Sequence, residues 1–152
     1  MEKGIIFNAE MVRAILDGRK TMTRRLNKQW LKVKAGDRLW VRETWKPHVQ
    51  TSVHSPAIYR ADYPLGSGPG PWISSRFMPR WASRITLEAT ADARLEKLQK
   101  ITGMDVGREG FEWDAMGDDP FYRFAKYWDS LNPKSPWKNN PEVVVIEFKN
   151  GS

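Results

Sequence analysis

The chain has 152 residues, enough for one domain that buries about two thirds of the surface of its unfolded chain in a single core. It contains no cysteine, which excludes disulfides, zinc sites built on thiolates and cysteine nucleophiles, and favours the reducing cytoplasm as its compartment. Lysine and arginine number 25 against 18 acidic residues, which gives a net charge of +7. The apolar run at residues 4–7 is too short for a signal peptide or a membrane span, so no membrane partner is expected.

The positive charge is concentrated in the first part of the chain. Residues 1–45 hold 11 basic and 5 acidic side chains, whereas residues 96–152 hold 8 basic and 10 acidic ones. A concentrated basic surface is typical of nucleic-acid binding, because cations that neutralise phosphates release condensed counterions. Eight tryptophans add side chains that can stack on unpaired bases. The same charge also keeps many proteins soluble, so composition leaves both interpretations open.

The chain begins with a short predicted strand at residues 4–7 and a predicted helix at residues 9–17. Asn8 suits the N-cap of this helix, and apolar residues recur behind it at helical spacing. Gly18 stands where a left-handed glycine would end the helix. A strand-like alternation follows at once, in residues 21–25.

The segment from Gly18 to Arg25 concentrates reactive side chains. A tight turn at Gly18 can bring Lys20 close to Thr23, although the two would point to opposite faces of a regular strand. A lysine that is partly removed from water has a lowered pKa, and its neutral amine can take the proton of a hydroxyl and so activate it as a nucleophile. The spacing allows this pairing but does not require it.

The remaining elements alternate between short strands and short helices. Thr102-x-x-Asp105 is typical of a capping box, and Pro120 starts a helix whose apolar stripe is interpreted as packing. The stripe consists of Phe121, Phe124, Ala125, Trp128 and Leu131. Further strands are predicted at residues 38–45, 57–61, 85–95 and 143–148. This order predicts an α+β, β-rich domain, most simply a small barrel with helices closing its ends.

Two further segments join arginine to tryptophan. Arg42 with Trp45 ends one predicted strand, and residues 80–84 precede another. For Arg42 and Trp45, a nucleic-acid site and a half-buried strand with a solvated cationic face are equally open interpretations. Pro79 argues against a central strand at the second segment, so Arg80 and Trp81 are expected at the mouth of a strand. The only histidines, His48 and His54, lie in a segment without a nearby acidic cluster, so no metal site is expected there.

Taken together, these motifs resemble the ASCH domain, a branch of the PUA-like superfamily, and in particular the longer ASCH proteins common in phages and prophages. The matching residues are Gly18-Arg19-Lys20-Thr21-x-Thr23-Arg24-Arg25, Gly36-Asp37-Arg38-Leu39-Trp40-Val41-Arg42-Glu43, Met78-Pro79-Arg80-Trp81-Ala82-Ser83-Arg84 and Val145-Ile146-Glu147-Phe148. The resemblance implies a single domain over residues 1–152 with a small twisted six-stranded β-barrel, flanking helices and a cleft for RNA or nucleoside ligands. Residues 46–76 and 111–140 would then be a loop insertion and a helical aromatic insertion.

The resemblance also implies a candidate catalytic set. Some compact ASCH proteins are amidohydrolases that remove the acetyl group of N(4)-acetylcytidine with a lysine, a threonine and a glutamate. Carried over by motif, these residues are Lys20, Thr23 and Glu109. Lys20 would be the general base, Thr23 the nucleophile, and Glu109 would orient the lysine or pass a proton to the leaving amine, with no metal or other cofactor. Other ASCH proteins resemble single-strand ribonucleases.

Three hypotheses remain open at this point. In the first, the protein binds RNA or a modified nucleoside, with single-stranded DNA as an alternative partner, through a basic cleft that carries tryptophan. The residues assigned to this binding are Arg24, Arg25, Arg42, Trp45, Arg80, Trp81 and Arg84. In the second, the protein is a hydrolase that deacylates a modified cytidine or cuts RNA, which requires Lys20, Thr23 and Glu109 to converge within hydrogen-bond reach in one pocket. In the third, it is an interaction protein whose charge serves only its surface. The sequence does not indicate an oligomeric state.

Overall fold

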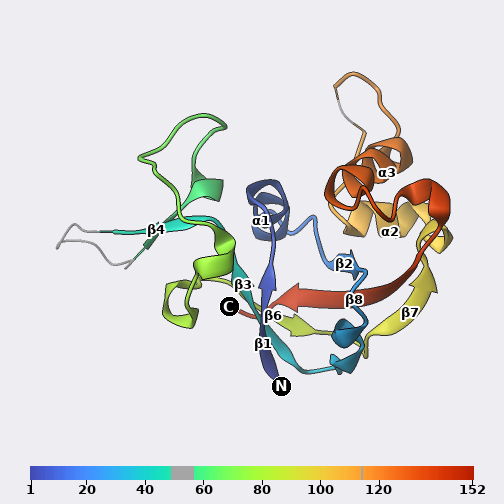
Figure 1. The fold of residues 1–152 in the computed structure, drawn as a ribbon, viewed down its shortest axis with the longest axis horizontal. Coiled ribbons are helices and arrows are strands. Elements are labelled where there is room, and N and C mark those ends of the chain that lie inside the picture. Colours follow the sequence, from blue (N-terminus) through green and yellow to red (C-terminus); the bar gives the residue numbers. More distant parts are fainter. Residues whose placement is uncertain (49–56, 114) are drawn as a thin grey trace.

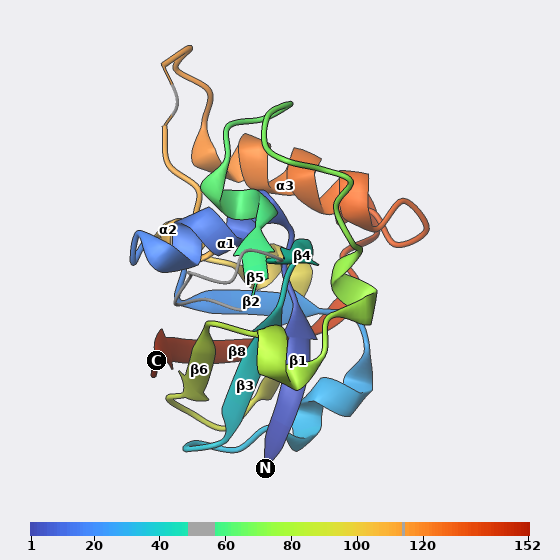
Figure 2. The same cartoon turned by 90° about the vertical axis from the view of Figure 1, so that its left-hand side faces the viewer.

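A computed structural model describes residues 1–48, 57–113 and 115–152 of the chain. Six strands form one curled mixed sheet in the order β1-β3-β6-β8-β2, with β7 also paired to β8. Their bounds are β1 Glu2–Ile6, β2 Met22–Arg25, β3 Arg38–Arg42, β6 Thr86–Ala89, β7 Arg94–Lys97 and β8 Glu142–Asn150. The sheet curls beneath three helices, which gather on one side of it (Figures 1 and 2). The predicted α+β class is confirmed, and the barrel takes the form of an open half-barrel with β1 and β2 as its edge strands.

Strand β8 organises the sheet. Its run Val143–Ile146 is fully buried, as expected for β-branched residues that are covered on both faces. One side of β8 pairs with β2, and the other side pairs first with β7 and then with β6. All these pairings are antiparallel, whereas β1 and β3 are parallel. The last strand of the chain therefore fixes the position of β2, which carries Thr23 and Arg24.

The strand predicted at residues 85–95 is wrong in one respect, because it is broken in two. Strand β6 ends at Ala89, and β7 begins at Arg94. Between them the backbone forms hydrogen bonds with the loop at residues 33–36. The Ala89 carbonyl accepts from the Gly36 amide, and the Ala93 amide donates to the Val33 carbonyl. These bonds hold the chain where the sheet curls, so the alternating pattern continues while the strand does not.

The helices begin and end where the capping residues predict. Helix α1 spans Ala9–Leu16, and the side chain of Asn8 accepts from the Met11 amide at 2.9 Å. Gly18 has φ +79°, the left-handed conformation expected of it. Helix α2 spans Gly103–Arg108 and is capped by the Thr102 hydroxyl, and α3 spans Pro120–Leu131 with Asp119 as its N-cap. Each element is thus started by local side-chain hydrogen bonds.

The apolar stripe of α3 is buried only in the middle. Phe124 and Trp128 are almost completely buried, whereas Phe121 and Leu131, in the first and last turns, are exposed. Phe124 packs against Phe111 and Trp137, which come from the segments before and after the helix. The prediction of a single packing stripe is therefore correct for the centre of α3 and wrong for its ends, which extend past the core.

A two-stranded sheet stands beside the half-barrel. It consists of β4 Trp45–Pro47 and β5 Ala57–Tyr59, so the strand predicted at residues 38–45 ends at Arg42 and Trp45 belongs to a separate element. A small core of its own, with Met78 and Ala82, packs under this sheet. His54 lies outside the described residues. Within the described residues, none of the helices has the length and apolar character needed to cross a membrane.

Candidate active site

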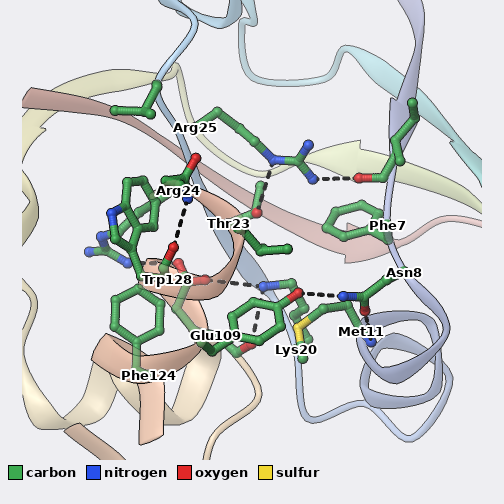
Figure 3. A pocket seen from close by; sticks show the side chains of 15 residues that line it. Phe7, Asn8, Met11, Lys20, Thr23, Arg24, Arg25, Glu109, Phe124 and Trp128 are labelled. Atoms are coloured by element: carbon green, nitrogen blue, oxygen red, sulfur yellow. Dashed lines mark hydrogen bonds and ion pairs between the residues drawn. The ribbon is translucent and has the colours of Figure 1, made fainter. Parts of the chain in front are cut away.

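A pocket of about 310 Å³ lies between β2, the N-terminus of α1, the end of α2 and helix α3 (Figure 3). The three residues predicted as a catalytic set, Lys20, Thr23 and Glu109, all line it. Its size is at the lower end of the range for small-molecule sites. The structure therefore brings the predicted set into one cavity, although Glu109 is 89 residues away from Lys20 along the chain. Within the set, Lys20 bonds to Glu109, whereas the Thr23 hydroxyl accepts from Arg25.

Lys20 is buried and fully paired. Its Nζ donates to the Met22 carbonyl at 2.8 Å, to the Glu109 carbonyl at 3.0 Å and to Glu109 Oε1 at 3.1 Å. Burial lowers the pKa of Lys20 from its ordinary value of 10.5, and the adjacent Glu109 carboxylate opposes this change. Gly110 has φ +105°, and a Cβ there would come within 3.2 Å of Ala14, so the glycine lets the chain pass close to α1. The protonated Lys20 thus donates to three acceptors. Because burial lowers its pKa, less free energy is needed to form the neutral amine at physiological pH than for an exposed lysine.

Glu109 is held from both sides. Oε1 meets Lys20, and Oε2 accepts from Arg24 NH1 at 2.9 Å. Arg24 is itself completely buried and also pairs with Glu96 at 2.8 Å and with Asp105 at 3.5 Å. The carboxylate therefore has a fixed orientation, and Arg24 acts as a positioning residue inside the protein. As the structure stands, the Arg24 side chain is not presented to a phosphate at the surface.

Thr23 lies beside a second arginine. Its Oγ1 accepts from Arg25 Nε at 3.3 Å, and the same guanidinium donates through NH2 to the Ile6 carbonyl at 2.7 Å (Figure 3). The guanidinium also lies 4.8 Å from the centre of the Phe7 ring. Because the Thr23 oxygen accepts this bond, its own proton is free to point elsewhere, and the nearby cation favours the hydroxyl's deprotonated form.

The wall opposite β2 is aromatic, and sequence reasoning missed its role. Phe124, Tyr127 and Trp128 of α3 line the pocket. The Tyr127 hydroxyl accepts from the Asn8 side-chain amide at 2.7 Å, and burial raises the pKa of Tyr127 to about 12. The sequence predicts only a helix cap at Asn8, but its side-chain oxygen caps α1 while its side-chain nitrogen donates to Tyr127 in the pocket. The signal that could have indicated this wall is the tyrosine between the two buried aromatics.

The remaining residues assigned to nucleic-acid binding do not form one cleft. Arg25 lies at the pocket, but Trp45 is only 5% exposed and packs in the core under the β4–β5 sheet. Arg42 and Arg80 lie on another face, each close to the Trp40 ring. Trp81 is exposed and meets Trp45 edge to face. The predicted single basic cleft is therefore divided between a pocket and a separate surface.

Arg84 is occupied by acidic partners. It forms two bonds with the buried carboxylate of Glu43, at 3.0 and 3.1 Å, and a third with Asp62 at 2.9 Å. It also lies 4.1 Å from the centre of the Tyr59 ring. These contacts join the end of β3 to the β4–β5 sheet, so Arg84 serves the fold in this structure.

Replacing Arg84 with alanine is expected to lower the free energy of unfolding by about 3 kcal/mol at neutral pH, because Glu43 would be left buried and unpaired. Burial already raises the pKa of Glu43 above 4.5, and without Arg84 it would rise further. A raised carboxyl pKa means that the folded state loses stability as pH rises through that pKa. The deficit relative to wild type should therefore shrink as pH is lowered toward 4.5, which urea titrations at several pH values can measure. A deficit that stays the same at acid pH would contradict this role.

Comparison with known proteins identifies the fold. No family model matches the chain, and no curated protein matches it. The chain is similar to the crystal structure of hypothetical protein PH0355, with a TM-score of 0.53, 14% identity and 99% of both chains covered. It is also similar to protein EF3133 from Enterococcus faecalis V583, family-model DUF984, with a TM-score of 0.51, 10% identity, and 99% of this chain and 79% of that chain covered. An ASCH domain from Lactobacillus crispatus JV V101 has a TM-score of 0.47 at 12% identity, with 98% of this chain and 79% of that chain covered.

At these identities the similarity shows the fold and leaves the activity open. The assignment rests on the first two structures, whose TM-scores exceed 0.5. The α+β class expected from the sequence is thus confirmed, and the chain shares the fold of these two proteins.

Proposed function

We propose that the protein is an amidohydrolase that acts on N(4)-acetylcytidine or a similar acylated nucleoside in the pocket of Figure 3. The observation that carries this proposal is the buried Lys20–Glu109 pair, with 3.1 Å between Nζ and Oε1, in the same cavity as the Thr23 hydroxyl. Perturbed pKa values in a cleft are typical of catalytic groups. The apolar and aromatic lining suits a flat base.

The proposed reaction begins when Lys20 is neutral. Its amine takes the Thr23 proton while Oγ1 attacks the acyl carbon, and Arg25 stabilises the charge on the threonine oxygen. The C–N bond then breaks, and the leaving amine receives a proton from Lys20, with Glu109 holding the lysine in place. Water next attacks the acyl-threonine ester and gives its proton to Lys20. The bond between the acyl carbon and Oγ1 then breaks, Lys20 returns the proton to Oγ1, and the acid formed leaves as acetate after losing its own proton to water.

Replacing Lys20 with methionine is expected to lower kcat for N(4)-acetylcytidine by about 10²- to 10⁴-fold, because the variant lacks the general base. Glu109 keeps Arg24 as a partner, so the fold should survive. In the wild type, kcat/KM should rise with pH as Lys20 loses its proton, with a midpoint below 10.5 because burial lowers this pKa. Chromatography of cytidine and acetate over a range of pH values measures both effects.

The matched control is Lys28→Met, which removes an exposed lysine that pairs with Glu142. It should hydrolyse the nucleoside at the wild-type rate. Equal rates for Lys20→Met and wild type, or a profile that does not rise with pH, would contradict the proposal. Mixed single-stranded RNA in the same assay tests the ribonuclease alternative, because fragments that depend on Lys20 would replace acetate as the product.

A second proposed function is binding of nucleic acid, either RNA or single-stranded DNA. It is supported by the arginines and tryptophans that lie outside the pocket, on the face that carries Arg42, Arg80 and Trp81. Its affinity should fall steeply with salt concentration.

A further inference from the structure

The outer face of strands β1 and β3 carries an unusual group of side chains. Leu39 and Val41 of β3 point into the core, so Trp40 and Arg42 point outward. Gly4 of β1 pairs with Trp40, and a Cβ at Gly4 would lie 2.9 Å from the Trp40 ring and 2.8 Å from Arg42 Cδ. The glycine therefore lets both side chains lie across β1.

Two arginines approach the Trp40 ring. The Arg42 guanidinium is 5.5 Å from its centre, and the Arg80 guanidinium is 5.7 Å away. Arg42 also donates to the Arg76 carbonyl, which ties β3 to the turn that contains Arg76. Glu2 supplies an acidic side chain to this group, and its carboxylate lies 2.9 Å from Arg80 Nε. In this group the positively charged side chains outnumber the negatively charged one, and they surround an aromatic ring.

Two large aromatic side chains extend this surface. Phe77, in the 3-10 turn Ser75–Phe77, is 71% exposed, and Trp81, in the turn Arg80–Ala82, is 59% exposed. Both turns lie next to β1 and β3 in the two ribbon views (Figures 1 and 2). Trp81 is held edge to face against the buried Trp45, with 5.6 Å between ring centres. We call the surface formed by Trp40, Arg42, Arg76, Phe77, Arg80 and Trp81 the outer platform.

We propose that the outer platform binds single-stranded nucleic acid. A polyanion would compensate the positive charge that Glu2 leaves on the platform, and exposed aromatic rings stack on bases of any sequence. A duplex hides the faces of its bases, so exposed Phe77 and Trp81 favour a single strand. Glu2 offsets the charge of Arg80 alone, so a neutral or basic protein partner would leave the remaining positive charge of the platform uncompensated. This inference rests on the second proposed function, which it deepens by naming the surface and the form of the nucleic acid.

The outer platform also adjoins the pocket. Ile6 lines the pocket and is the register partner of Arg42, and its carbonyl accepts from Arg25. The platform and the pocket therefore lie on different faces but share a border at Ile6. Nucleotides next to the one in the pocket would then contact the platform.

The test measures binding of a fluorescein-labelled 12-nucleotide RNA of mixed sequence to the wild-type protein and to Arg76→Ala/Phe77→Ala. Both side chains are exposed, so the double variant should fold. Loss of one stacked base and one phosphate contact should weaken binding by about 10- to 100-fold. The slope of log K against log salt should become smaller in magnitude by about 0.7. Trp113→Ala/Lys134→Ala, which removes one exposed aromatic residue and one cation elsewhere, should bind like wild type.

The outcomes distinguish failure of nucleic-acid binding as a function from failure of the outer platform as its site. Wild-type protein that does not bind the RNA overturns nucleic-acid binding and the platform together. Binding that is unchanged by Arg76→Ala/Phe77→Ala, or equally tight binding of a duplex of the same sequence, overturns the platform alone. The measurement needs no turnover, so its result does not depend on hydrolysis of N(4)-acetylcytidine.

Discussion

Thr23→Val should abolish hydrolysis of N(4)-acetylcytidine, with kcat reduced by more than about 10⁴-fold, because valine has nearly the shape of threonine but no nucleophilic oxygen. The substitution changes no charge and removes only the bond from Arg25 Nε. The fold should therefore remain intact, and melting temperatures should confirm it. Mass spectrometry of the wild-type enzyme quenched during turnover should show a gain of one acetyl group, which Thr23→Val should lack.

Thr23→Ser is the matched control, since it keeps the hydroxyl and loses one methyl group. It should retain a large part of the wild-type rate and still form the acyl-enzyme. Substantial turnover by Thr23→Val would show that water attacks directly. Lys20 would then remain a candidate base, and Thr23 would lose its assigned role.

Glu109→Ala should cause the largest loss of stability, about 3–5 kcal/mol, because it removes the carboxylate shared by two buried cations. The Lys20 and Arg24 side chains are 3% and 0% exposed, so water cannot replace that partner. Glu109 raises the pKa of Lys20, and its removal should lower that pKa further. A lowered lysine pKa means that stability rises with pH up to the ordinary value of 10.5, so the deficit should shrink in alkaline buffer. Urea titrations at neutral and alkaline pH measure it.

Glu112→Ala provides the comparison, because Glu112 lies on the same segment but is 66% exposed, 3.7 Å from Arg19. An exposed pair of this kind contributes little, so this variant should unfold close to wild type. Equal stability of Glu109→Ala and Glu112→Ala would mean that the buried carboxylate is dispensable.

Local features of the fold could be predicted because local residues determine them. Asn8, Gly18, Thr102 and Pro120 mark the ends of helices through hydrogen bonds and backbone conformations that involve a few neighbouring residues. The run of β-branched residues in β8 likewise indicates a buried strand. The broken strand at residues 90–93 could not be predicted, because its cause is a loop more than 50 residues earlier.

The residues of the candidate site could be predicted only in part from the sequence. Spacing allowed Lys20 to approach Thr23, but Glu109 entered through the resemblance to a family, and no local pattern links it to Lys20. Arg24 and Arg84 were expected at a surface because both are cations beside hydroxyl or aromatic residues. Their acidic partners, Glu96 and Glu43 among them, come from distant parts of the chain, and a linear pattern does not show which cations will be paired. The assignment of residues 46–76 and 111–140 as insertions stays a prediction.

The contact of Arg25 with Ile6 determines how the half-barrel is closed. Strands β1 and β2 are its two edges, and among the described residues one guanidinium, rather than a row of amide bonds, spans them. Parting these edges would cost roughly the 1–3 kcal/mol of a hydrogen bond to a charged group. A cost in this range corresponds to an open form that makes up between roughly 1% and roughly 15% of the molecules before any ligand arrives. A base could thus enter from the side of the sheet with every strand pairing intact, and the same residue that polarises Thr23 would control access to it.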